Sequence, residues 1–100
     1  MKGKERAGLR AEAHHLRATV HVGHHGLTDT LLQSLDDALE ARELVKVQVE
    51  RNAPLSVKET ANELALQMKA EVIQVIGRKA SLYRFNPELH RNPDSGPAWR

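Results

Sequence analysis

The pattern of apolar and polar residues divides the chain into three helical and four extended segments. Apolar residues recur three or four positions apart in three segments, and each of these predicts an amphipathic helix. The predicted helices are residues 4–17, 28–42 and 56–70. Four shorter segments are rich in β-branched residues and predict strands. The predicted strands are residues 19–22, 44–50, 72–76 and 81–85.

Local signals support the starts of two helices and one face of the sheet. Thr28 is a suitable N-cap, and Ser56 followed by Glu59 has the spacing of a capping box. In the strand 44–50, valines alternate with Lys46 and other polar residues. Because side chains of a strand point to alternate faces, one face of the sheet should meet water.

The order of these segments predicts the fold class. A strand, a helix and a strand within about thirty residues form a βαβ unit, whose two strands should be parallel. The last two strands are joined through residues 77–80, which predict a hairpin turn. The chain therefore predicts an α+β domain of order αβαβαββ, with two layers and a four-stranded mixed sheet.

The domain is expected to span residues 1–85. Beyond Phe85 the pairs Asn86-Pro87 and Asn92-Pro93 predict a loose tail over 86–100, which also holds Trp99.

The net charge is only +2, but the charges are unevenly distributed. Residues 1–26 hold five lysines and arginines against two glutamates, and residues 78–100 hold five against two acids. Residues 27–43 hold five acids and one arginine. This asymmetry predicts one positive face suited to phosphates, although a charged surface can also be merely solvated.

Composition excludes several kinds of chemistry. The chain has no cysteine, so disulfides, cysteine-ligated zinc and a thiol nucleophile are excluded. No run of eighteen apolar residues is present, so no membrane span is predicted, and we expect a cytoplasmic protein.

The sequence Gly23-His24-His25-Gly26 lies between a predicted strand and a predicted helix. Glycines can take backbone angles that a Cβ forbids and let a ligand approach the main chain, and a helix start offers free N–H groups to an anion. The spacing predicts a loop that holds a nucleic-acid backbone, with a plain strand-to-helix turn as the alternative.

Five histidines within twelve residues allow a second interpretation. Imidazole nitrogens bind zinc and nickel, so the cluster could be a metal site. Adjacent histidines tend to point apart, however, and no carboxylate lies within the cluster, so solvated or RNA-facing histidines are favoured and no metal is predicted. The five residues are His14, His15, His21, His24 and His25.

Motifs in a fixed order give the chain a family resemblance. They are Leu9, His14-His15-Leu16, a Val-x-Val-Gly-x-x-Gly-Leu-Thr pattern over 20–28, Ala38-Leu39, Glu43-Leu44-Val45-Lys46-Val47, Gln74 to Lys79, and Leu82-Tyr83-Arg84. Over about residues 4–85 the chain resembles the CRM domain, the chloroplast RNA splicing and ribosome maturation family, in its stand-alone bacterial YhbY-like form.

This resemblance implies an RNA-binding protein without catalytic activity or cofactor. It also implies a fold similar to the C-terminal domain of bacterial initiation factor three and a partner in large-subunit ribosomal RNA or its precursor particle. The candidate RNA-binding residues are Gly23, His24, His25, Gly26, Arg6, Arg10, Arg17, Lys46, Arg78, Lys79 and Arg84. Many relatives place lysine, arginine or small polar residues between the two glycines, whereas this chain has His24 and His25. Because histidine can gain or lose a proton near neutral pH, the charge of this loop should depend on pH.

Two further function classes remain open at this stage. A protein-interaction module could use the acidic helix or the polar sheet face on a ribosomal particle without contacting RNA. An enzyme or metal carrier could use the histidines, but no nucleophile with an ordered acid or base is found.

With few aromatic residues, recognition of RNA should depend on its backbone and shape, because platforms for stacked bases are scarce.

Overall fold

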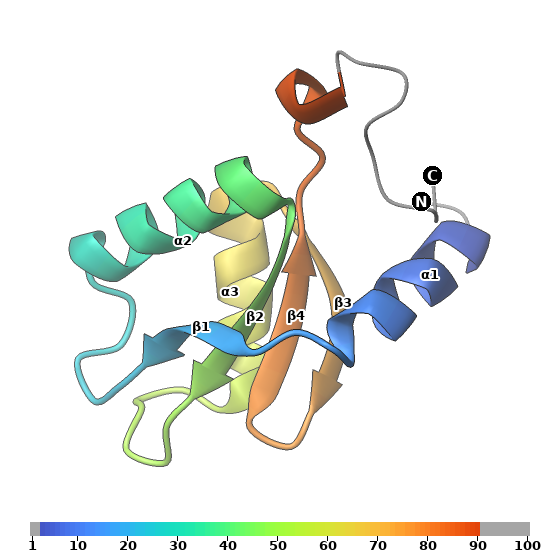
Figure 1. The fold of residues 1–100 in the computed structure, drawn as a ribbon. Helices are drawn as coiled ribbons and strands as arrows, with labels where there is room; N and C mark the ends of the chain where they lie inside the picture. The colour runs from blue at the N-terminus through green and yellow to red at the C-terminus, as the bar shows by residue number, and fades with distance from the viewer. Residues whose placement is uncertain (1–2, 91–100) are drawn as a thin grey trace.

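A computed structural model describes residues 3–90 as three α-helices, four strands and a short 3-10 helix. The helices are α1 (Gly3–Ala13), α2 (Asp29–Arg42) and α3 (Val57–Met68), and the strands are β1 (Ala18–Val22), β2 (Leu44–Val49), β3 (Glu71–Ile76) and β4 (Lys79–Tyr83). The predicted order and the mixed sheet are confirmed (Figure 1). Among residues 3–90, no helix combines the length and apolar character that crossing a membrane requires.

The sheet has the order β1-β2-β4-β3. β1 and β2 are parallel, as the βαβ unit predicts, and β4 runs antiparallel to both of its neighbours. β3 and β4 form the predicted hairpin around Gly77, whose φ of 59° suits the first position of a two-residue turn. β1 and β3 are therefore the two edge strands.

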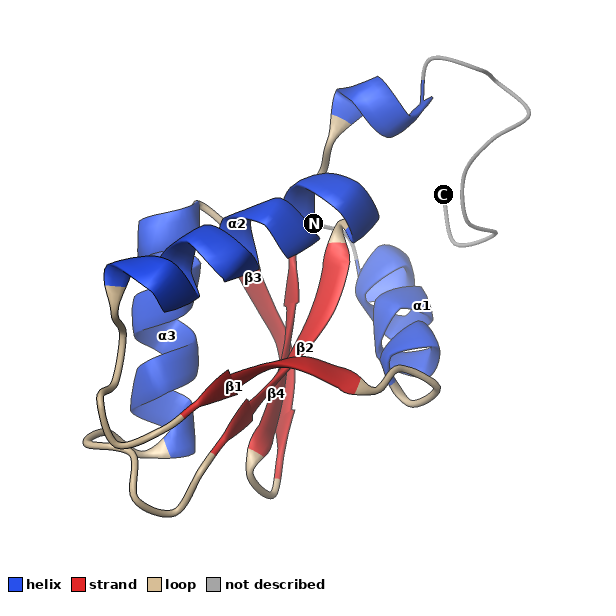
Figure 2. Cartoon of the chain, turned by 60° about the vertical axis from the view of Figure 1, so that its left-hand side comes forward, coloured by secondary structure: helices blue, strands red, loops and turns tan. Residues whose placement is uncertain are grey.

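Helices cover both faces of the sheet, so the domain has three layers where the sequence predicted two (Figure 2). α2 and α3 pack on the face that carries the valines of β2, with Leu35, Leu39 and Leu64 fully buried between them and the sheet. α1 packs on the opposite face, where Leu9 and Ala13 meet Tyr83. A single apolar stripe fits either face of a sheet, so periodicity does not say which face a helix covers.

Capping fixes the starts of α2 and α3, and a turn of the chain ends α1. The Thr28 hydroxyl accepts from the Leu31 N–H at 3.2 Å, and Ser56 forms the predicted capping box with Glu59. α1 ends at Ala13, four residues earlier than predicted, because the chain turns there and brings Leu16 back to the cluster beneath α1.

The residues after β4 remain attached to the domain. Asn86 is buried, its backbone N–H donates to the Glu43 carboxylate at 2.7 Å, and Pro87–His90 form the 3-10 helix. The expectation of a loose segment therefore does not hold for residues 86–90. The rest of the predicted tail, including Trp99, lies outside the described residues.

Candidate functional site

The glycine loop follows β1 directly and forms a tight turn. The carbonyl of Val22, the last residue of β1, accepts from the Glu50 N–H at 2.8 Å, which fixes the start of the loop beside the end of β2. Within the loop the Gly26 N–H donates to the Gly23 carbonyl at 3.0 Å. Thr28 then caps α2, so the short loop leads directly from the strand into the helix.

The two glycines of the loop differ in backbone conformation and in the space around them. Gly26 has a φ of +68°, and a Cβ added there would lie 2.9 Å from Cγ of Pro54. Gly23 has no positive φ, and an added Cβ would have nothing within 4 Å. Only Gly26 needs glycine for the turn, whereas the space at Gly23 is open to a ligand.

The two histidines between the glycines are exposed and lie against each other. Their ring centroids are 3.9 Å apart with an interplanar angle of 41°, so the expectation that adjacent histidines point apart is wrong for His24 and His25. The Nδ1 atom of His21 lies 3.4 Å from a carboxylate oxygen of Glu50. Among residues 3–90 no three histidine, aspartate or glutamate side chains are grouped to hold a metal ion.

The glycine loop, the loop over residues 50–56 and the hairpin turn lie at one end of the sheet, which we term the loop end (Figure 1). The register places His21 beside Gln48 and Gln48 beside Lys79. The Val49 N–H donates to the Arg78 carbonyl at 2.8 Å, so the hairpin turn lies next to the end of β2. Neighbouring strands are about 4.8 Å apart, so β1 and β4, which lie on either side of β2, are separated by about 10 Å.

Two predicted cations, Arg78 and Lys79, belong to this end, and a third, Lys46, lies in the middle of β2 opposite Ser81. Lys46 and Lys79 lie on the sheet face that α1 leaves open, where they line a hollow of about 120 Å³ with His14 and Ser81. Arg78 is exposed at the hairpin turn. Lys46, Arg78 and Lys79 form no ion pair with an acid in the described part of the chain. Their charges are therefore open to a ligand.

Sequence reasoning missed Arg51, which is exposed in the loop after β2. This loop contacts the glycine loop, because Pro54 lies against Gly26. The signal was present in the sequence: strands predicted to be parallel end at the same edge of a sheet, so the residues after β1 and after β2 must be neighbours.

Arg84 does not lie with these cations. Its guanidinium donates to the Asp36 carboxylate at 2.8 Å, to the Asp36 carbonyl at 3.2 Å and to the Met68 carbonyl at 3.1 Å. It also pairs with Glu40 at 3.6 Å, and its side chain is only 18% exposed. The prediction that Arg84 shares one surface with the loop is wrong, because this residue joins α2 to the end of α3.

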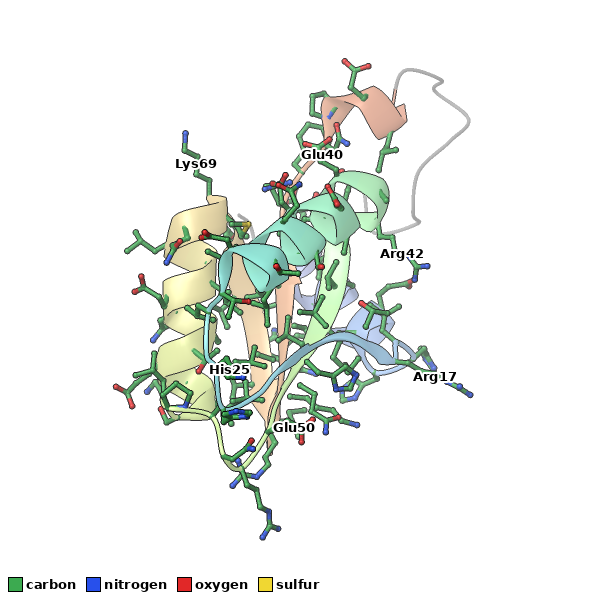
Figure 3. The ribbon with its side chains drawn as sticks, turned by 90° about the vertical axis from the view of Figure 1, so that its left-hand side faces the viewer. Arg17, His25, Glu40, Arg42, Glu50 and Lys69 are labelled. Carbon is green, nitrogen blue, oxygen red and sulfur yellow. The ribbon has the colours of Figure 1, made fainter. Side chains whose placement is uncertain are left out.

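Arg84 belongs to what we term the clamp end, the opposite end of the sheet, together with Glu43 and Asn86. Arg84 donates its backbone N–H to the Glu43 carbonyl at 2.9 Å, and the Asn86 side chain donates to the Glu40 carbonyl at 2.7 Å. In Figure 3, Glu40 and Lys69 lie far from His25 and Glu50, which mark the loop end.

The three candidate arginines of the N-terminal segment have different surroundings. Arg6 donates to the Val72 carbonyl at 2.9 Å and pairs with Glu71 at 3.4 Å, which fixes α1 to β3. Arg10 is exposed on α1. Arg17 lies beyond the end of the helix and points away from the ribbon at the start of β1 (Figure 3).

A groove of about 360 Å³ lies beside the glycine loop. It is bounded by the outer edge of β1, the loop and the first half of α2. Its lining is mostly apolar, with hydroxyl groups from both sides. The hydroxyl-bearing residues are Thr19, Thr28, Thr30 and Ser34.

Comparisons with known proteins find a family model that matches this chain and relatives that are similar in sequence. The model of the CRS1/YhbY (CRM) domain family matches residues 1–84. The Bacillus subtilis protein named probable RNA-binding protein YqeI is 35% identical over 88 residues, which cover 88% of this chain and 92% of that protein. A Haemophilus influenzae protein named RNA-binding protein is 34% identical over 85% of this chain and 86% of its own length.

A solved structure has the same fold. The solution structure of a hypothetical Staphylococcus aureus protein, described as a candidate RNA-binding protein, superposes with a TM-score of 0.73. It is 35% identical in sequence, and the match covers 86% of this chain and 90% of that one.

Proposed function

Because this chain belongs to the CRS1/YhbY (CRM) domain family, we propose that it binds RNA and that the loop end of the sheet is its RNA-binding surface. The observation that carries the proposal is an open Gly23 at the same end of the sheet as Arg78 and Lys79, with Lys46 further along β2. These three cations pair with no acid of residues 3–90. Lysine and arginine attract phosphates, and a glycine without close neighbours lets a phosphate approach the main chain. The names of the relatives support the same function.

We further propose that the RNA is large-subunit ribosomal RNA in its precursor particle and that the protein acts in ribosome assembly. The family resemblance suggests this partner. The Gly23–Gly26 loop would hold the RNA backbone, with Lys46, Arg78 and Lys79 on neighbouring phosphates.

The experiment is a binding series with large-subunit ribosomal RNA fragments at increasing salt. The test variant is Arg78→Ala/Lys79→Ala, which removes two charges from the loop end. The matched control is Arg42→Ala/Lys69→Asn, which removes two charges at the C-terminal ends of α2 and α3. Asparagine is chosen at Lys69 because this residue has a φ of 54°, which asparagine tolerates.

Each phosphate contact contributes about 0.7 to 0.9 to the slope of log affinity against log salt concentration. The test variant should therefore lose about 1.5 from the slope, and the control should keep the slope of the unmodified protein. Equal slopes in both variants would contradict the proposed surface. Tight binding to ribosomal proteins without RNA would favour the protein-interaction alternative instead.

A further inference from the structure

We propose that the groove beside the glycine loop receives one unpaired RNA base, so that the protein selects single-stranded or bulged RNA over continuous duplex. This inference rests on the proposed function and makes it more specific. It concerns the groove between β1 and α2, which is separate from the cations on the open sheet face.

The size and lining of the groove suit a flat, partly polar ring. Its volume of about 360 Å³ lies at the lower end of the range of small-ligand sites, about 300 to 1,000 Å³. Val20 and Leu31 contribute apolar surface, and the hydroxyls of Thr30 and Ser34 lie on the opposite wall from β1. A nucleobase combines an apolar face with polar edges, which matches this lining.

The backbone of β1 offers hydrogen bonds to such a base. β1 is an edge strand that pairs only with β2. The Val22 carbonyl points to β2, where it accepts from Glu50, and successive residues of a strand direct their backbone groups to alternate sides. The N–H and carbonyl of His21 therefore point to the open edge, on the side of the groove, where they can pair with the polar edge of a base.

The glycine loop places the sugar-phosphate backbone at the mouth of this groove. Gly23, His24 and His25 line the groove as well as forming the loop. An unpaired base stacks on histidine rings as it does on other aromatic side chains, and the two loop histidines present such rings at the site. A phosphate held at Gly23 would thus leave its base within reach of the groove.

A base inside a continuous duplex cannot reach this groove, because its polar edge is paired and its faces are stacked. Swinging it out costs unpairing and unstacking energy, which is least for a base that is already single-stranded or bulged. The groove therefore predicts a preference for RNA with unpaired bases.

The test compares two RNAs of the same sequence, a short single strand and the same strand paired with its complement, at one salt concentration. The test variant Ser34→Phe fills the groove from the exposed face of α2. The matched control Gln33→Phe places the same ring on the neighbouring exposed position, which does not line the groove. Thermal unfolding of each variant establishes that it is folded.

We expect the unmodified protein and Gln33→Phe to bind the single strand about tenfold more tightly than the duplex. In Ser34→Phe this preference should disappear, while affinity for the duplex stays unchanged. A preference that persists in Ser34→Phe, or equal affinity of the unmodified protein for both RNAs, would overturn this inference and leave the proposed function standing. Failure of the unmodified protein to bind either RNA would overturn the proposed function itself.

Discussion

At the clamp end of the sheet, Arg84 donates to Asp36 at 2.8 Å and to the Met68 carbonyl, and its side chain is mostly buried. At the loop end, Arg78 and Lys79 project from the hairpin without an ion pair to any acid of residues 3–90. The same class of side chain thus stabilises the fold at one end and is open to a ligand at the other. The difference arises from the neighbours of each cation rather than from its charge.

The largest effect on stability is expected from Arg84→Ala. The substitution removes hydrogen bonds between charged groups and leaves the Met68 carbonyl without its donor. Such bonds contribute about 1.5 to 3 kcal/mol each, and partial exposure of Asp36 lowers this, so the free energy of unfolding should fall by about 2 kcal/mol. Urea unfolding measures the change. An unchanged midpoint would contradict the structural role of Arg84, and RNA affinity of the folded variant should stay the same.

The two loop glycines give the next comparison. Gly26→Ala should lower the free energy of unfolding by about 1 to 2 kcal/mol, because its φ of +68° and Cγ of Pro54 at 2.9 Å both oppose a Cβ. Gly23→Ala should leave stability within about 0.5 kcal/mol, because nothing lies within 4 Å of the added carbon.

Gly23→Ala should nonetheless weaken RNA binding several-fold, because the methyl group occupies the space into which a phosphate would come. Thermal unfolding and RNA titration of the same sample separate the two effects. Normal RNA affinity in Gly23→Ala would show that the loop is only a turn.

A smaller effect is expected from pH. Histidine gains a positive charge as pH falls through the range from 8 to 5, so RNA should bind more tightly at pH 6 than at pH 8. The variant His24→Gln/His25→Gln should flatten this dependence. His21 lies on β1, outside the loop, and contacts Glu50, so His21→Gln is the control that should keep most of the dependence. Identical pH profiles of all three proteins would exclude a role for the loop histidines.

The smallest effect is expected from Arg6→Ala. The side chains of its ion pair with Glu71 are 36% and 47% exposed, and exposed pairs contribute about 0 to 1 kcal/mol. Loss of the bond to the Val72 carbonyl adds a little to this. We expect a decrease of about 1 kcal/mol in the free energy of unfolding and an unchanged salt dependence of RNA binding. A reduced salt slope would show that Arg6 contacts RNA after all.

Much of the fold could be predicted from the sequence because its signals are local. Capping at Thr28 and Ser56, the alternation in β2 and the turn at Gly77 each depend on a few adjacent residues. The two-layer arrangement was wrong because the face on which α1 packs depends on contacts with Tyr83 and Leu44, which are distant in the sequence.

The candidate site was predicted less completely for the same reason. The glycine loop and the hairpin cations form motifs of adjacent residues, and the structure brings them to one end of the sheet. Arg84 belongs to an equally clear motif, but its role depends on Asp36, which is 48 positions away. The groove was not predicted, because it forms only where residues of different elements come together. Thr19 of β1 and Ser34 of α2, for example, both line it.

The central claim is that RNA contacts the loop end and leaves the clamp end free. The most direct measurement follows the backbone amide NMR signals of the protein as a large-subunit ribosomal RNA fragment is added. We predict that the signals of residues 21–28, 46–51 and 77–80 change, and that those of residues 36–43 and 84–90 do not. Changes concentrated on the acidic face of α2 and around Arg84 would contradict the account.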